Sequence, residues 1–237
     1  MMGLGRTGQP RGKEFYIDME IIAEHKRILE EAERFARTEL ENDPTGHDWW
    51  HVRRVVRMAE RLAAQEGADA FICALAALLH DVADEKLNES KESGLRKADD
   101  WLDGQPLDEE SRRHVLEIIA TMSYNAGANP PMRTLEGQVV QDADRLDAIG
   151  AIAIARTFLY AGWIGHPIYD PDLPPRDAMT PKEYRRDKST AINHFYEKLL
   201  KLKDKINTAS ARAIAEERHR YMEQYVERFL SEWEGRS

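Results

Sequence analysis

The sequence has a single cysteine among its 237 residues, so it offers no second thiol for an intramolecular disulfide. This residue, Cys73, lies inside the apolar run of residues 71–79, where a buried structural thiol is favoured over a nucleophile. A chain without a disulfide framework is typical of a reducing compartment. We therefore expect a cytoplasmic protein.

Long apolar runs and excess positive charge are also missing. No apolar stretch approaches the roughly 18 residues that a membrane-spanning helix needs, so we expect no membrane partner. The formal net charge is −9 at pH 7. Because surfaces that bind nucleic acid usually carry an excess of Lys and Arg, this charge argues against a nucleic-acid partner. A local basic pocket for one small phosphate ligand remains compatible with it.

The composition that is present, 42% hydrophobic and 32% charged, is typical of a globular protein. A chain of 237 residues can bury a substantial core but is short for most two-domain proteins. We expect one domain over residues 15–237. Residues 1–14 are rich in glycine and basic, without the apolar stretch of a signal peptide, and are predicted to form a flexible tail.

Apolar residues recur with a helical period, and no stretch shows the sustained alternation of a strand. The sequence therefore predicts an all-α, single-domain helical bundle. The expected helices cover residues 15–41, 47–66, 69–83, 90–102, 108–122, 134–161, 188–205 and 208–234.

Residues 162–181 hold five of the ten prolines. Proline removes a backbone donor and blocks the continuation of a helix, so this segment is predicted to be a loop. Loops of this length are often lids or binding elements, but a rigid connector is an equally good interpretation. Both alternatives stay open at the level of sequence.

Three of the expected helices carry ionisable side chains on apolar faces. His51 lies on the core-facing stripe of the helix 47–66, where a satisfied core histidine would be the simplest explanation. The pair His80-Asp81 ends an apolar run, and burying such polar groups is costly. A polar cap at the end of that helix explains the pair equally well.

The third of these helices, residues 134–161, carries Asp144 and Asp147 one turn apart beside its buried face. Two carboxylates in this arrangement would repel each other unless a cation or Arg145 stood between them. Asp142 points elsewhere by helical geometry, and we expect it to be a solvated surface residue.

Taken together, a lone His, a later His-Asp pair at a helix end and a final Asp on another helix resemble the signature of the HD superfamily of metal-dependent phosphohydrolases. The resemblance extends over residues 47–161 and includes Leu-Leu-His-Asp at 78–81 and Asp-Ala-Asp-Arg-Leu-Asp-Ala-Ile-Gly at 142–150. Gly-His-Asp-Trp-Trp-His-Val at 46–52 and His-Phe-Tyr-Glu-Lys-Leu at 194–199 are similar to a branch of small bacterial proteins that includes nucleotide pyrophosphatases.

The resemblance implies an HD-type helical fold and one divalent metal ion as cofactor, with the ligands His51, His80, Asp81 and Asp144. Imidazole nitrogen and carboxylate oxygen suit Mn, Fe, Mg or Zn, of which we favour Mn or Mg. The implied reaction is attack of a metal-bound hydroxide on a phosphate anhydride or ester, with a nucleotide as the expected substrate. A homodimer is compatible with the sequence.

Further roles follow from the same resemblance. Asp84 resembles the acidic residue after the His-Asp pair that several HD hydrolases use for acid/base work. The motif there often reads Glu-Asp, whereas this chain has Asp84-Glu85, and we take both as candidate catalytic residues. A structural residue at the end of a helical turn is the alternative for Asp84.

Four side chains are candidates for contacts with the substrate: Arg54, Arg145, Lys86 and Asp147. The three cations could clamp phosphate oxygens or pair with a carboxylate, and Asp147 could instead orient a metal ligand. His194 and Lys198 could close the pocket, although packing of their helix is the simpler interpretation.

Two other functions remain open. A phosphomonoesterase or cyclic-nucleotide phosphodiesterase would use the same metal chemistry. A non-catalytic module that binds a nucleotide or a metal would keep the fold without the reaction. The complete set of two histidines and two aspartates argues against this module, because buried carboxylates without partners cost stability.

Overall fold

The computed structural model describes residues 11–41, 48–84, 87–123, 129–176 and 188–236, and only the backbone of residues 11–18. Helices and turns make up these ranges, with no strand among them, which confirms the all-α fold class. The α-helices are α1 (Arg11–Leu40), α2 (Trp49–Glu66), α3 (Ala70–Leu79), α4 (Lys91–Asp103), α5 (Glu109–Thr121), α6 (Leu135–Asp147), α7 (Ala151–Trp163), α9 (Ala191–Glu197) and α10 (Ala209–Trp233). Two short 3₁₀ helices, η2 (Leu199–Lys201) and η3 (Lys203–Lys205), follow α9.

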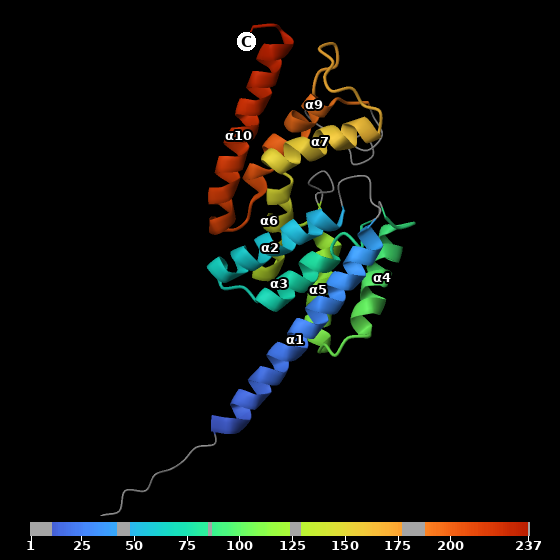
Figure 1. The fold of residues 1–237 in the computed structure, drawn as a ribbon, viewed down its shortest axis with the longest axis vertical. Helices are drawn as coiled ribbons and strands as arrows, with labels where there is room; N and C mark the ends of the chain where they lie inside the picture. Colours follow the sequence, from blue (N-terminus) through green and yellow to red (C-terminus); the bar gives the residue numbers. More distant parts are fainter. Residues whose placement is uncertain (1–10, 42–47, 85–86, 124–128, 177–187, 237) are drawn as a thin grey trace, which may run out of the picture.

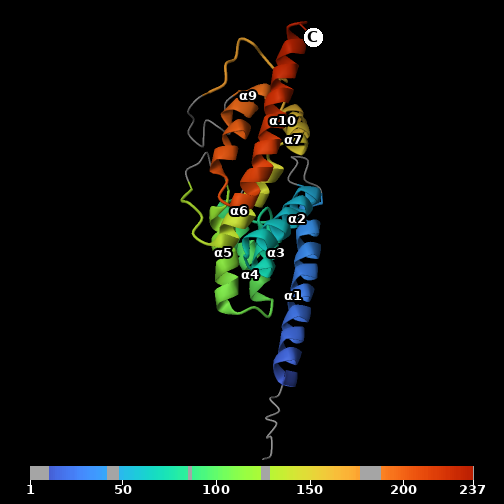
Figure 2. The same cartoon turned by 90° about the vertical axis from the view of Figure 1, so that its left-hand side faces the viewer.

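The helix α3 lies in the core of the bundle. It packs against α1, α2, α5 and α6, and its residues from Ile72 to Leu79 are all buried. Figure 1 shows α1, α4 and α5 toward one end of the molecule and α7, α9 and α10 toward the other. The rotated view in Figure 2 shows α7, α9 and α10 at the same end, with α2, α3 and α6 in the middle of the molecule. The candidate metal ligands lie on α2, on α6 and in the turn that follows α3.

Local capping decides where these central helices begin. Asp48 precedes α2, and its carboxylate accepts the N–H of His51 at 3.0 Å. This N-cap fixes His51 in the first turn of α2. Asp69 caps α3 in the same way, by accepting the N–H groups of Phe71 and Ile72. Each cap satisfies helix-end donors that would otherwise lack partners.

The predicted helix 134–161 is wrong as one element, because α6 ends at Asp147 and α7 begins at Ala151. The break falls at Gly150, whose φ of +90° is a conformation that side chains with a Cβ rarely adopt. A Cβ at this position would also stand 3.0 Å from Cγ of Arg218. The glycine therefore permits both the change of direction and the close approach of α10.

Other boundaries also differ. The helix predicted over 188–205 is shorter, because α9 ends at Glu197 and two 3₁₀ turns follow. The helix α1 begins at Arg11, inside the predicted tail 1–14, and residues 1–10 lie outside the described ranges. The predicted loop 162–181 begins later, because residues 162 and 163 still belong to α7; residues 164–176, the rest of its described part, contain no helix or strand. Within the described ranges, the helices are too short or too polar to cross a membrane.

Candidate metal centre

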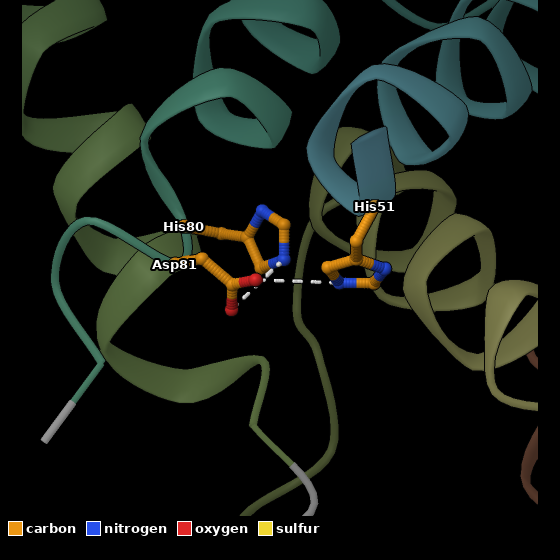
Figure 3. Close-up of side chains that lie close together, drawn as sticks. All are labelled: His51, His80 and Asp81. Carbon is orange, nitrogen blue, oxygen red and sulfur yellow. Dashed lines mark ion pairs between the residues drawn. The ribbon is translucent and has the colours of Figure 1, made fainter. Parts of the chain in front are cut away.

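Two segments bring three ligand-type side chains together in the core. His51 comes from the first turn of α2, and His80 and Asp81 come from the turn that follows α3. Figure 3 shows the two imidazole rings and the carboxylate facing one another. One potential ligand atom from each residue lies within 4.8 Å of the others, and all three residues are buried. This spacing is compatible with a single shared ion.

The imidazole nitrogens of the cluster lie close to its carboxylate oxygens. Nε2 of His51 lies 3.3 Å from Oδ2 of Asp81, and Nε2 of His80 lies 3.3 Å from Oδ1 of the same carboxylate. Asp144, from the last turn of α6, adds Oδ1 at 3.4 Å from Nε2 of His51. The four predicted metal ligands therefore surround one region of the core.

Hydrogen bonds on the far side of each imidazole orient the rings. Nδ1 of His80 lies 2.7 Å from the carbonyl oxygen of Ala77. Since a carbonyl only accepts, Nδ1 donates this hydrogen bond, and in the neutral imidazole Nε2 then carries the lone pair. That Nε2 is buried, without a hydrogen-bond partner among the described residues. A buried nitrogen lone pair beside a carboxylate fits a bound cation.

Asp147 performs the corresponding role for His51. Its Oδ2 lies 2.7 Å from Nδ1 of His51, and Arg54 donates to both carboxylate oxygens at 2.7 and 3.0 Å. Arg156 of α7 donates to Oδ2 at 2.8 Å. Burial alone would raise the pKa of Asp147, but the hydrogen bonds from His51 and Arg54 hold it well below its usual range. Asp147 is thus ionised and fixes His51 with Nε2 toward Asp81 and Asp144.

The carboxylates dominate the electrostatics of the cluster. Burial would lower the pKa of His51, but the negative charge of Asp81 and the hydrogen bonds to Asp144 and Asp147 raise it to about 9. Burial would raise the pKa of Asp144, yet the hydrogen bond to His51 and the nearby histidines lower it to about 2. In the metal-free protein, a proton on His51 thus compensates the negative charge of the carboxylates, as a bound metal cation would.

The remaining candidates have different surroundings. Asp84 is partly buried in a turn, with its N–H donated to the carbonyl of Asp81 at 3.0 Å. The helix predicted over residues 69–83 is shorter, because α3 ends at Leu79. The guanidinium of Arg145 donates to the carbonyl of Lys205. Glu85 and Lys86 lie outside the described residues.

Lys198 and Arg156 interact with the candidate metal centre more closely than the sequence analysis predicted. Burial lowers the pKa of Lys198, while the charges of Asp144 and Asp84 act in the opposite direction. This places a partly buried cation near both carboxylates. Arg156 was not a sequence candidate, although one signal was present: it is the only charged residue in the otherwise apolar α7.

Two other assignments are decided by burial. Asp142 is completely buried, so its expected surface position is wrong. The turn before α10 covers it, and its carboxylate accepts the N–H groups of Asn207 and Thr208 at 2.9 and 2.7 Å. Cys73 is buried as expected, and burial raises the pKa of its thiol to about 12. Such a thiol is a structural side chain and not a nucleophile.

Comparison with known proteins places this centre in a family. The family model for the HD domain matches residues 49–149, a range that includes His51, His80, Asp81 and Asp144. The chain belongs to the HD domain family.

Its relatives include small bacterial proteins of similar length. The uncharacterized protein YpgQ of Bacillus subtilis (strain 168) is 40% identical over 200 residues, which cover 83% of this chain and 89% of the relative. The crystal structure of an HD-superfamily hydrolase from Bacillus thuringiensis is 51% identical, with a TM-score of 0.71, and the match covers 89% of this chain and 98% of that chain. A crystal structure of Bacillus subtilis YpgQ in complex with ADP is 37% identical over 86% of this chain and 96% of that chain, with a TM-score of 0.68.

Proposed function

We propose that this protein is a metal-dependent phosphohydrolase that acts on the phosphate groups of a nucleotide. The observation that carries the proposal is the buried pair of imidazole Nε2 atoms directed at the carboxylates of Asp81 and Asp144. The relative from Bacillus thuringiensis, an HD-superfamily hydrolase, supports the reaction class. The complex of YpgQ with ADP supports a nucleotide ligand.

His51, His80, Asp81 and Asp144 would hold one divalent ion. Two nitrogen and two oxygen ligands suit Mn²⁺ or Mg²⁺, and the histidines favour Mn²⁺ over Mg²⁺. When bound, such an ion polarises a phosphate oxygen and lowers the pKa of water. Asp147 and the carbonyl of Ala77 keep both imidazoles in the tautomer that presents Nε2.

Other residues would bind the substrate and move protons. Asp84, one turn of chain beyond Asp81, would act as the acid/base group. Lys198 is the favoured partner for phosphate oxygens, because it lies near Asp144 and Asp84 and its pKa responds to both. Arg54 and Arg145 are less suitable as clamps, since their guanidinium groups already bond to Asp147 and to the carbonyl of Lys205.

The experiment is a substrate screen of the protein reconstituted with Mn²⁺ or Mg²⁺. Nucleoside tri-, di- and monophosphates are compared, and inorganic phosphate and pyrophosphate are measured separately. Release of pyrophosphate identifies a nucleotide pyrophosphatase, while release of phosphate from monophosphates alone supports the phosphomonoesterase. The Asp81→Ala variant should lose bound metal and activity together and keep its circular dichroism spectrum. Full activity in this variant would overturn the assignment.

A further inference from the structure

A cavity lies next to the candidate metal centre, and Asp147, which bonds to His51, is part of its lining. It has a volume of about 770 Å³ and opens between α2, the junction of α6 with α7, and α10. Five arginines line it: Arg54, Arg57 and Arg61 from α2, and Arg218 and Arg220 from α10. The spacing of three and four residues within α2 places its three arginines on one face of that helix.

The charge of this cavity is opposite to that of the molecule. Its lining includes two carboxylates, Asp147 and Glu217, against five guanidinium groups, although the whole chain carries a net charge of −9. Asp147 is already bonded to His51, Arg54 and Arg156. The arginines of the cavity therefore carry more positive charge than its two carboxylates can neutralise.

The arginines differ in how they are held. Arg57, Arg61 and Arg220 are exposed, and none forms an ion pair with a carboxylate among the residues that the structure describes. Arg218 is partly buried, and its guanidinium donates to the carbonyl of Leu146 at the end of α6. Arg218, and Arg54 through its bonds to Asp147, are thus fixed in the wall, while the other three arginines can adapt to a ligand.

The backbone adds donors of the same kind. Residues 150–152, the start of α7, also line the cavity. No side chain caps this helix start, because Gly150 occupies the N-cap position. The first N–H groups of a helix and its dipole favour a bound anion. Together with the arginines, they match the oxygens of phosphate groups.

We propose that this cavity is an anion site, separate from the metal centre, that binds the diphosphate group of a small molecule. The carboxylate of Asp147 divides the two sites: it faces Nδ1 of His51, while Nε2 of His51 faces Asp81 and Asp144. Ile152 and Tyr221, 48% and 52% exposed, also line the cavity. A nucleoside attached to the diphosphate would contact these two side chains.

The test is isothermal titration calorimetry of the metal-free protein with inorganic pyrophosphate, ADP and adenosine. Pyrophosphate and ADP should both bind, and adenosine should not. Tighter binding of ADP than of pyrophosphate assigns the site to a nucleotide, and equal affinities assign it to the diphosphate group alone. Binding of adenosine with the affinity of ADP would overturn the proposal, because the phosphates would then contribute nothing.

Variants locate the site. The double variant Arg57→Ala, Arg61→Ala removes two exposed side chains and should weaken pyrophosphate binding by at least about tenfold, since charge-assisted hydrogen bonds are lost. The matched control is Arg34→Ala with Arg37→Ala, two exposed arginines on α1, and it should bind as the wild type does. Equal affinity of both double variants would overturn the proposal.

The Asp81→Ala variant separates this site from the metal centre. It should keep its affinity for pyrophosphate, because Asp81 does not line the cavity. Tighter pyrophosphate binding in Asp81→Ala would assign the anion to the metal centre instead, because the lost carboxylate would repel an anion bound there. Since these titrations use metal-free protein and no hydrolysis, their failure would leave the proposed reaction untouched, and failure of the reaction would leave this site untouched.

Discussion

Asp142 and Asp147 are both buried on α6, and their partners give the two carboxylates different roles. Asp147 bonds to the candidate metal ligand His51 and to Arg54 and Arg156. Asp142 accepts N–H groups at the turn before α10. Substitution of either aspartate by asparagine changes the charge with little change of shape, so the pair offers a matched comparison.

For Asp147→Asn we expect metal affinity to fall by about 10- to 100-fold, as is typical when the partner of a metal-bound histidine is lost. The control, Asp142→Asn, should lose about 1–3 kcal/mol of unfolding free energy with its charge-assisted hydrogen bonds, but keep its metal affinity. Calorimetric metal titration and urea denaturation measure the two quantities. Equal metal affinities in the two variants would show that Asp147 does not position His51.

The raised pKa of His51 predicts a pH dependence for the metal-free protein. The unfolded chain loses this proton near pH 6.5, while the folded protein keeps it to about pH 9. The stabilising contribution is therefore complete below pH 6.5 and is lost as the pH rises through 9. Between these values the free energy of unfolding should decrease by on the order of 3 kcal/mol, measured with urea and a chelator. In His51→Gln this decrease should disappear; if it persists there, another group causes it.

Asp84 can be tested by separating metal binding from turnover. Asp84→Asn should keep the metal, because Asp84 is not a predicted ligand, but its rate should fall by about 10²–10⁴, as expected for a lost general acid or base. The measurement is kcat against pH, together with the metal content. A profile like that of the wild type would reduce Asp84 to a structural turn residue.

At the scale of single residues, the sequence was sufficient to predict which histidines and aspartates form the candidate metal cluster. The side chains of the candidate ligands His51, His80, Asp81 and Asp144 lie close together, while their role as metal ligands stays a prediction. The sequence did not predict Arg156 or the burial of Asp142. Both depend on which elements pack over a helix face, and those elements are distant in the chain.

Among the elements, residues 164–176 and α9 are tied together. The carbonyls of Pro167 and Ile168 each accept an N–H from the start of α9, at 3.1 Å. Arg176 forms two side-chain hydrogen bonds with Glu197, at 2.8 and 2.9 Å, and the Glu197 side chain is 2% exposed. These bonds favour the connector over the lid for this part of the predicted loop.

Removal of Arg176 should therefore be costly. Arg176→Ala leaves a buried carboxylate without its main partner, and such a break typically costs about 3–5 kcal/mol. The control is Lys203→Ala, which removes the more exposed ion pair between Lys203 and Glu216 and should cost less than about 1 kcal/mol. Urea denaturation at neutral pH compares the two variants. Similar losses in both would show that residues 164–176 are not held by Arg176.

The helix boundaries show where the sequence was sufficient. Two starts were predicted to within one residue: α5 begins at Glu109, directly after its N-cap Asp108, and α10 begins at Ala209. The break at Gly150 was missed because apolar periodicity continues across it. The reason for a glycine at this turn is a contact that the sequence does not show: Arg218 of α10 packs against residue 150 and leaves little room for a Cβ there.

At the scale of the whole molecule, the candidate ligands join segments that are far apart in the chain. They come from the start of α2, the turn after α3 and the end of α6. These three helices pack against one another in the middle of the bundle. Because residues 51, 80, 81 and 144 meet only in the folded chain, a metal ion should bind the folded state and not the unfolded state.

Metal binding should consequently raise the melting temperature. A ligand present at about 100 times its dissociation constant stabilises the folded state by about 2.7 kcal/mol, which corresponds to about 5–11 °C for a chain of this size. The measurement is calorimetric melting with chelator and with excess Mn²⁺. Asp81→Ala should show no increase, whereas the control Asp204→Ala, at an exposed position in η3, should show the full increase. An equal increase in both variants would mean that the ion binds elsewhere and that the central cluster stabilises the fold by its own ion pairs.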